Sequence, residues 1–423
     1  MILDDPRSVR PEYQPIVDLT TGTVVGYEAL ARWPQHPRVD PSVVFSIATE
    51  RGAIDEVDWA CRYAAVAGAL DSGLERDLSL FVNIEPLSSR VPPDYAREMI
   101  RTAATALNVV VEITERSLLT DPAVLLETVR FARVNGCLIA LDDVGSHPDS
   151  LALLEFVAPD IIKLDYALVQ SDPSPQQAAV VLAIAAHVES SGAWILAEGI
   201  ETDGHLRRAR GLGASLGQGW MYGRPAPLGS RIRSPRTNNL GESIDRMIHP
   251  VNFGPPGRPG VVVPSVPSDV LGSAPARVGS KALLLTLTRQ LEDHAQSMHD
   301  PLTIQSAFQD ADWFTPAVAD RYAKLAADNP FVAALGVGMD AVPALGVRGA
   351  RLDPDERFVG EWTITVVGPH YFAALIARDL GDDGPDGDRR FAFMLTHDRL
   401  TVIAAARSLM SRVFPATTGT RHV

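Results

Sequence analysis

The amino-acid sequence predicts an α/β fold in two parts, a closed (β/α)8 barrel followed by a smaller α/β domain. Between Glu12 and about Pro227, short apolar runs alternate with helical patterns, which is typical of parallel strands covered by helices. Eight such runs within roughly 200 residues suit a closed barrel. The first two runs are joined only by Thr20–Thr21–Gly22, a link short enough for a hairpin. We therefore expect one barrel strand to run antiparallel to the others.

The barrel domain is expected to span residues 1–228, with strands and helices in alternation. Helices are expected at 41–70, 94–107, 123–135 and 176–190, where apolar residues recur at helical spacing. The expected strands are YQPIVDL (13–19), TVVGYEAL (23–30), LSLFVNI (78–84), NVVVEIT (108–114), CLIALDD (137–143), DIIKLD (160–165), AWILAEGI (193–200) and the weaker ASLGQGWMYG (214–223).

A linker and a second domain are expected after the barrel. Residues 229–279 are rich in Pro, Gly, Ser and Arg, a composition that resists packing, although a short helix at 242–247 is possible. The second domain should occupy 280–415, followed by a tail at 416–423. Its expected helices lie at 280–298, 316–327, 371–380 and 400–414, and its strands at 331–338, 361–368 and 389–395.

The composition limits the classes of function. A net charge of −14 argues against nucleic-acid binding and against anionic membranes, although a bound metal can still attract a phosphorylated ligand. The apolar runs are too short for a bilayer-spanning helix, and the polar N-terminus is no signal peptide. Cys61 and Cys137 lack metal-ligand spacing and are expected to be buried thiols. These features together predict a cytoplasmic protein.

Polar side chains follow nearly every expected barrel strand. The ends of parallel barrel strands meet on one face, so these side chains should converge there. Gathered carboxylates repel one another, and a pair of divalent cations would neutralise them. Because the set contains no His or Cys, it favours Mg²⁺ or Mn²⁺ over zinc or copper. The residues are Glu28, Asn83, Glu112 with Glu115, Asp142 with Asp143, Lys163 with Asp165, Glu198 with Glu201, and Gln218.

Each of these residues has an ordinary structural explanation when it is taken alone. A single acidic residue at a strand end is more often a solvated turn or a helix N-cap. Thr114–Glu115 could be such a cap, and Lys163 could be a surface lysine beside Asp165. The functional interpretation is favoured because nearly every strand ends on a side chain that can bind metal, and separate structural explanations for all of them would require a coincidence.

Six motifs carry a family resemblance. GYEALARW, VVVEITE, LIALDDVG, DIIKLD, LAEGIE and GQGWMYGRP occur in this order, and together they resemble the EAL domain of cyclic-di-GMP phosphodiesterases. The resemblance covers about the first half of the chain. It implies a barrel with two Mg²⁺ or Mn²⁺ ions, hydrolysis of cyclic di-GMP to linear 5′-pGpG, and a homodimer formed through this domain.

The resemblance also implies a role for each matching residue. One metal would be held by Glu28, Asn83, Glu112 and Asp142, and Asp142 would bridge to a second metal held by Asp143 and Glu198. Lys163 would hold and help to activate the attacking water, and Gln218 would orient it. We expect the pKa of Lys163 to be lowered by burial and nearby metals. Arg32 would contact a substrate phosphate, and Gln14 would contact a guanine. Glu115 would steady the loop after Asp143, and Glu201 would support the surroundings of the metals.

The loop after the paired aspartates departs from the family pattern. Where the family usually has DDFGTGYSS, this chain has DDVGSHPDS, so Val144, His147, Pro148 and Asp149 differ, and Ser215 stands where Asp is frequent. In the family this loop couples the metal site to the dimer interface. Replacement of Gly by His147 and the fixed φ of Pro148 restrict the loop backbone. The changes bear on turnover and dimer coupling more than on ligand binding.

The second domain resembles the DICT domain, a sensory module of cyclic-di-GMP and two-component proteins. The matching features include Phe308–Gln309, Glu361–Trp362 and VVGPHYFAALIARDL. The His397–Asp398 pair lacks the further His and Asp motifs of an HD phosphohydrolase, so we interpret Thr396–His397–Asp398 as a turn that caps the last helix.

Three functions fit these observations. The leading hypothesis is a metal-dependent cyclic-di-GMP phosphodiesterase controlled by its C-terminal domain. The alternative is a weak or inactive barrel that acts as a cyclic-di-GMP receptor, which the altered loop keeps open. A scaffold with no metal or nucleotide affinity in the barrel is the third.

Overall fold

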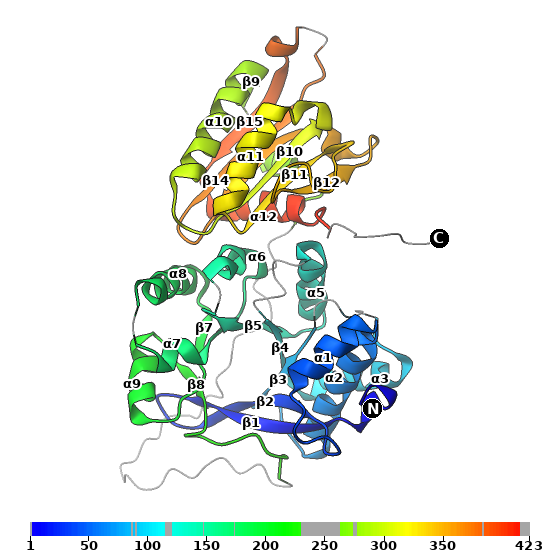
Figure 1. The fold of residues 1–423 in the computed structure, drawn as a ribbon, viewed down its shortest axis with the longest axis vertical. Helices are drawn as coiled ribbons and strands as arrows, with labels where there is room; N and C mark the ends of the chain where they lie inside the picture. The colour runs from blue at the N-terminus through cyan, green and yellow to red at the C-terminus, as the bar shows by residue number, and fades with distance from the viewer. Residues whose placement is uncertain are drawn as a thin grey trace.

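The structure of the chain is a computed structural model that describes residues 2–85, 88, 91–114, 121–146, 148–172, 174–229, 263–273, 277–382 and 385–414. These residues form an N-terminal barrel, blue to green in Figure 1, and a C-terminal domain built on one sheet. None of the helices in these ranges combines the length and the apolar character that a bilayer crossing requires.

The barrel is closed, and its strands follow one another in chain order around it. β1 is antiparallel to both of its neighbours, β2 and β8, and the other neighbouring strands are parallel. The expected barrel with one reversed strand is therefore confirmed. The strands are β1 (Arg10–Asp18), β2 (Val24–Arg32), β3 (Ser79–Asn83), β4 (Asn108–Thr114), β5 (Leu138–Val144), β6 (Ile161–Leu164), β7 (Trp194–Ala197) and β8 (Leu216–Gln218).

Helices cover the outside of the barrel. The expected helix at 41–70 is two helices, because the chain turns at Gly52, whose φ of 67° suits glycine. Ser174 and Gln177 form a capping box at the start of α8. The helical elements are η1 (Ile2–Asp4), η2 (Pro6–Ser8), α1 (Pro41–Glu50), α2 (Ile54–Asp71), α3 (Asp94–Ala106), α5 (Pro122–Val134), η3 (Pro148–Leu153), α6 (Leu154–Val157), α7 (Tyr166–Gln170), α8 (Pro175–Ser191) and α9 (Asp203–Gly211).

The C-terminal domain is a seven-stranded mixed sheet of order β12-β11-β10-β13-β14-β15-β9. Helices α10 and α11 pack with one face of the sheet, and α12 packs with the other. The elements are η4 (Pro267–Ser273), β9 (Arg277–Ser280), α10 (Lys281–Ser297), β10 (Thr303–Asp310), η5 (Ala311–Trp313), α11 (Pro316–Asp328), β11 (Phe331–Val337), β12 (Arg348–Leu352), η6 (Arg357–Gly360), β13 (Glu361–Val367), β14 (Phe372–Asp379), η7 (Asp386–Asp388), β15 (Arg390–Thr396) and α12 (Arg399–Met410).

One expected element has the wrong type. The segment 371–380 was expected to be a helix, but it contains β14, a strand between β13 and β15. Residues 373–377 are fully buried, so both faces of the strand are apolar. A short continuous apolar run shows no alternation of apolar and polar residues, so its periodicity does not distinguish a buried strand from a helix. The Ala-rich sequence therefore predicted a helix.

The expected boundary at residue 280 is also wrong. η4 contacts α12, β13 and β14, and β9 pairs with β15, so the C-terminal domain begins before residue 280. Val266 and Leu271 are buried in its core. The Pro- and Gly-rich composition predicted a linker here, but contact with the edge of the sheet stabilises this segment. The possible helix at 242–247 and the tail at 416–423 lie outside the described residues.

Helix α12 lies between the two domains. Every residue from Val402 to Met410 is buried, although a helix on a domain surface normally keeps one face in water. One side of α12 packs on β10, β13 and β14, and it also contacts α5 and α6 of the barrel. Figure 1 shows α12 at the junction of the two domains. Apolar residues of the barrel and of the sheet consequently join in one buried cluster.

We predict that Glu361 makes the C-terminal domain less stable as the pH rises. Burial raises the pKa of Glu361 to about 7 from an ordinary value of 4.5. Between these pH values the folded domain keeps a proton that the unfolded chain has lost, so the free energy of unfolding falls with pH. Replacement of Glu361 by Gln should remove this loss, which is roughly 3 kcal/mol above pH 7.

Thermal melting at pH 5 and pH 8 checks this prediction. The melting temperature of Glu361→Gln minus that of the natural chain should be larger at pH 8 than at pH 5. Glu189→Gln, at an exposed site on α8, is the control and should show no such change. An equal difference at both pH values would contradict the prediction.

Candidate metal centre

The interior of the barrel has an apolar layer and, beyond it, a polar layer. Side chains of a strand alternate between its two faces, so residues two apart point into the barrel together. Ala140 and Asp142 on β5 are such a pair, and so are Ile161 and Lys163 on β6. The same step joins Phe81 to Asn83, Val110 to Glu112, Leu196 to Glu198 and Leu216 to Gln218.

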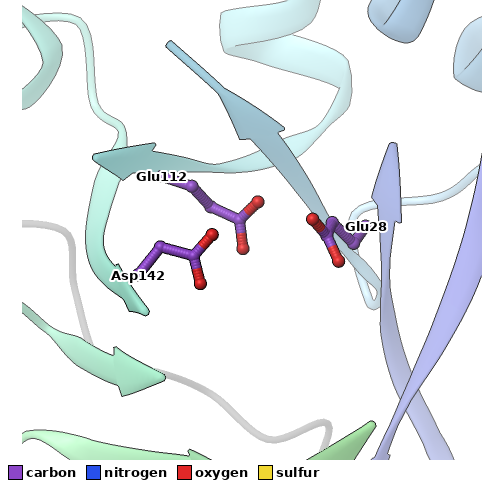
Figure 2. Close-up of side chains that lie close together, drawn as sticks. All are labelled: Glu28, Glu112 and Asp142. Carbon is purple, nitrogen blue, oxygen red and sulfur yellow. The ribbon is translucent and has the colours of Figure 1, made fainter. Parts of the chain in front are cut away.

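Three carboxylates form the first group in the polar layer. Glu28 on β2, Glu112 on β4 and Asp142 on β5 are buried, and each offers an oxygen within 4.8 Å of the others. Figure 2 shows these side chains turned toward one another. Asn83 Nδ2 donates to Glu28 Oε1 at 3.2 Å and to Glu112 Oε2 at 3.0 Å. The structure thus brings together all four residues expected around the first metal.

A second group shares Asp142 with the first. Asp142, Asp143 and Glu198 also offer oxygens within 4.8 Å of one another. Adjacent residues of a regular strand point to opposite faces, but Asp143 has a φ of 59° and the β5–β6 register shifts between Leu141 and Val144. This irregularity allows two neighbouring aspartates to serve one site.

Lys163 is the cation of the site. Its fully buried Nζ lies 2.7 Å from Glu112 Oε1, 2.8 Å from Asp142 Oδ1 and 2.9 Å from Glu198 Oε1. Burial favours the neutral amine, but Asp142, Glu112 and the other carboxylates outweigh it and raise the pKa of Lys163 well above its usual value. The expected lowering of this pKa refers to Lys163 beside bound metals, whose positive charge would oppose the carboxylates, and it stays a prediction.

The charges of this site do not balance. Among the residues that the structure describes, the Lys163 ammonium lies within 4 Å of the carboxylates of Glu28, Glu112, Asp142 and Glu198, and Asp143 adds a fifth carboxylate next to Asp142 and Glu198. Burial raises the pKa of Glu112 well above its usual value and that of Glu198 to about 8. All the donors are oxygens, which suit hard divalent cations such as Mg²⁺ or Mn²⁺. The donors of both overlapping groups therefore fit hard divalent cations.

Two glutamines complete the rim of the site. Gln218 Nε2 donates to Glu28 Oε2 at 2.6 Å and to Gln14 Oε1 at 3.0 Å, and Gln14 Nε2 donates to the carbonyl oxygen of Gly223. Gln218 Oε1 is buried and has no hydrogen-bond partner in the part of the chain that the structure describes. An acceptor of this kind, beside a metal centre, can receive a hydrogen bond from water.

A pocket of about 310 Å³ opens next to the carboxylates, lined by Asn83, Arg32 and Thr114 among others. Arg32 Nε donates to Glu12 Oε2 at 3.0 Å and remains about one third exposed. The sequence pattern alone does not predict this partner. β1 and β2 pair in antiparallel fashion, which places Glu12 opposite Leu30, and only that register reveals the contact.

A buried charge in the same pocket was also not predicted from the sequence. Asp58 on α2 forms an ion pair with Arg62 and accepts from the Ser88 hydroxyl at 2.5 Å. Burial raises the pKa of Asp58 despite these partners. An Asp–Arg pair four residues apart beside Trp59 and Cys61 was the available signal.

Some candidate residues have other places in the structure. Glu201 is exposed and belongs to neither carboxylate group, so its supporting role stays a prediction without a contact behind it. Asp165 caps α7 by accepting from the backbone N–H of Ala167 at 2.7 Å. Glu115 and His147 lie outside the described residues.

The other singled-out residues are structural. Asp398 caps α12 by accepting from the Thr401 N–H, and His397 Nδ1 lies 2.8 Å from the Phe372 carbonyl oxygen, which confirms the expected turn. Cys61 and Cys137 are free thiols, and burial raises the pKa of Cys137 to about 11.

Family models match both parts of the chain. Residues 5–225 match the EAL domain. Residues 268–380 match the sensory domain found in diguanylate cyclases and two-component systems, known as DICT.

Similar proteins were found for the barrel half. The cyclic di-GMP phosphodiesterase RocR of Pseudomonas aeruginosa is 32% identical over 226 residues, which cover 51% of this chain and 57% of RocR. The probable cyclic di-GMP phosphodiesterase PdeB of Escherichia coli is 29% identical over 233 residues, covering 54% of this chain and 44% of PdeB. A structure of Klebsiella pneumoniae BlrP1 with manganese and cyclic di-GMP is 28% identical and covers 52% of this chain and 56% of that one, with a TM-score of 0.46. The chain spans 26–57% of the length of the first four curated relatives.

We predict that Mn²⁺ stabilises the barrel and that Asp142 matters most for this effect. Bound cations would relieve the repulsion among the carboxylates, so added Mn²⁺ should raise the melting temperature. Asp142→Asn should remove most of this rise, because Asp142 belongs to both groups. Differential scanning calorimetry with and without Mn²⁺ measures this rise in melting temperature. Asp382→Asn, in the C-terminal domain, is the control, and an equal Mn²⁺ effect in both variants would refute the assignment.

Proposed function

Because the chain belongs to the EAL-domain family, we propose that its barrel is a metal-dependent phosphodiesterase that hydrolyses cyclic di-GMP to linear 5′-pGpG. The observation that carries the proposal is the pair of carboxylate groups that share Asp142. The named activities of RocR and PdeB support the choice of substrate. An acidic protein needs bound cations to attract a dianionic nucleotide to five carboxylates.

The metal ligands are assigned from the two groups. Glu28, Asn83, Glu112 and Asp142 would hold one Mg²⁺ or Mn²⁺, and Asp142, Asp143 and Glu198 the other. Cations held there supply a water-derived nucleophile near neutral pH and neutralise charge on the phosphoryl oxygens. The fixed barrel strands keep these side chains in place, so little reorganisation is needed when substrate binds.

The remaining residues act on water and substrate. Lys163, held among the carboxylates, would bind the attacking water, and Gln218 would orient it through its free Oε1. Arg32 would exchange part of its contact with Glu12 for a substrate phosphate. Gln14 would contact a guanine, Glu115 would steady the loop after Asp143, and Glu201 would support the surroundings of the metals and the bound substrate.

The alternative is a receptor that binds cyclic di-GMP without turnover. The altered residues Val144, His147, Pro148 and Asp149 motivate it, because they directly follow Asp143. Val144 itself is fully buried, and Asp143 still belongs to the second carboxylate group. This geometry favours the enzyme, and turnover decides between the two.

Hydrolysis of cyclic di-GMP by the purified chain tests the proposal. With Mn²⁺ or Mg²⁺ we expect linear 5′-pGpG, and Glu28→Ala should lower the rate by roughly 100-fold or more, since it removes a metal ligand. Chelation should abolish the reaction. Product separation by chromatography measures the rate, with Asp382→Asn as a control that should keep the natural rate. Tight nucleotide binding without product would establish the receptor instead.

We also propose that the chain works in the cytoplasm as a homodimer formed through the barrel and that its C-terminal domain controls the rate. Light scattering after size exclusion should give twice the 45.5 kDa chain mass. A single-chain mass across the working concentration range would contradict the dimer.

A further inference from the structure

A buried carboxylate joins the two domains. Glu155 on α6 accepts from Arg399 Nε at 3.1 Å, with a second contact from Arg399 Nη2, and it lies 2.7 Å from His187 Nδ1. Arg407 Nη2 donates to the backbone oxygen of Glu155 at 3.0 Å. Both arginines belong to α12 of the C-terminal domain, whereas Glu155 and His187 belong to the barrel.

This contact is specific rather than a chance surface pair. Glu155, His187 and Arg407 are buried, and a buried charge that loses its partner is strongly unfavourable. Burial by itself would raise the pKa of Glu155, but His187 and Arg399 outweigh burial and hold the pKa below its usual range. The carboxylate is therefore ionised, and its bidentate contact with Arg399 fixes the orientation of α6 against α12.

Glu155 lies in the segment that leaves the metal centre. It follows Asp143 by twelve residues, and in between Leu151, Leu153 and Leu154 are fully or nearly fully buried. At the start of this segment Gly145 lies so close to Leu168 that a Cβ there would be 2.4 Å from its Cδ1. At these described positions a displacement of α6 would press on packed side chains rather than on empty space.

Asp143 stands at the start of this segment and has an unusual backbone conformation. Its φ of 59° is a left-handed conformation that a non-glycine residue keeps only when its surroundings hold it. The Ser146 N–H donates to the Asp143 carbonyl at 3.2 Å, which closes the turn directly after β5. The position of the Asp143 carboxylate therefore depends on how the following residues are anchored.

We propose that Glu155 is a positioning residue, through which Arg399 and Arg407 of the C-terminal domain hold the segment after β5 and thereby set the affinity of the Asp142, Asp143 and Glu198 group for a divalent cation. This inference rests on the proposed metal centre. It gives the C-terminal domain a physical route to the barrel site that does not involve the residues between the domains.

The test compares variants of the full chain. Glu155→Gln and Arg399→Gln remove the charge on either side, and Arg399→Lys keeps the charge without the bidentate geometry. Arg412→Gln is the matched control, because Arg412 follows α12 and pairs with Glu356 inside the C-terminal domain. Two quantities are measured: hydrogen–deuterium exchange of residues 138–157 without metal, and the Kd of Mn²⁺ by electron paramagnetic resonance of free Mn²⁺.

We expect faster exchange in residues 138–157 for Glu155→Gln and Arg399→Gln, and Mn²⁺ binding weakened by about 10-fold, as for other residues that orient metal ligands. Arg399→Lys should fall between these variants and the natural chain. The double variant Glu155→Gln/Arg399→Gln should bind Mn²⁺ no more weakly than the weaker single variant, because both changes break the same contact. Arg412→Gln should match the natural chain in both quantities.

A merely structural role predicts a different result. If Glu155→Gln and Arg399→Gln only lower the melting temperature, with exchange at 138–157 and Mn²⁺ affinity equal to those of Arg412→Gln, the positioning role is overturned. If the natural chain binds no Mn²⁺, the proposed metal centre fails, and the exchange measurement alone decides whether Glu155 holds the segment. Arg399→Lys provides this comparison even if Glu155→Gln does not fold.

Discussion

The gathering of carboxylates around one buried ammonium is the constraint on which the rest of this structure depends. Five acidic side chains converge at one end of the barrel, and Lys163 lies among them with three oxygens within 2.9 Å. In a weakly polar interior such an arrangement is stable only with matching positive charge. Beneath these side chains lies an apolar layer to which all eight strands contribute. This layer determines where along the barrel axis each polar side chain lies.

The same constraint explains the irregular end of β5. Two neighbouring aspartates can face one site only where the strand alternation is broken, and the left-handed Asp143 breaks it. We propose that the segment running from Asp143 to α6 helps to hold this conformation. In this chain α6 lies against α12, and Glu155 on α6 is bound by Arg399 and Arg407 of the C-terminal domain.

Sequence patterns predicted the barrel and most of its site, because strand ends in a parallel barrel meet on one face whatever the details of packing. They failed where a contact depends on register or burial. The pairing of Arg32 with Glu12 follows from the antiparallel register of β1 and β2. β14 was predicted to be a helix because both of its faces are apolar and buried. η4 and β9 were predicted to be part of a linker, because local composition does not indicate pairing with a strand that is distant in the sequence.

The sequence by itself determined which residues are available to bind metal and in what order the strands present them. Only the tertiary structure decided the charge state of Lys163, the exposed position of Glu201 and the burial of α12 between two domains. The reason is physical. The chemistry of a side chain is local and can be read from its type, whereas its pKa and its partners depend on charges and packing contributed by segments distant in the chain.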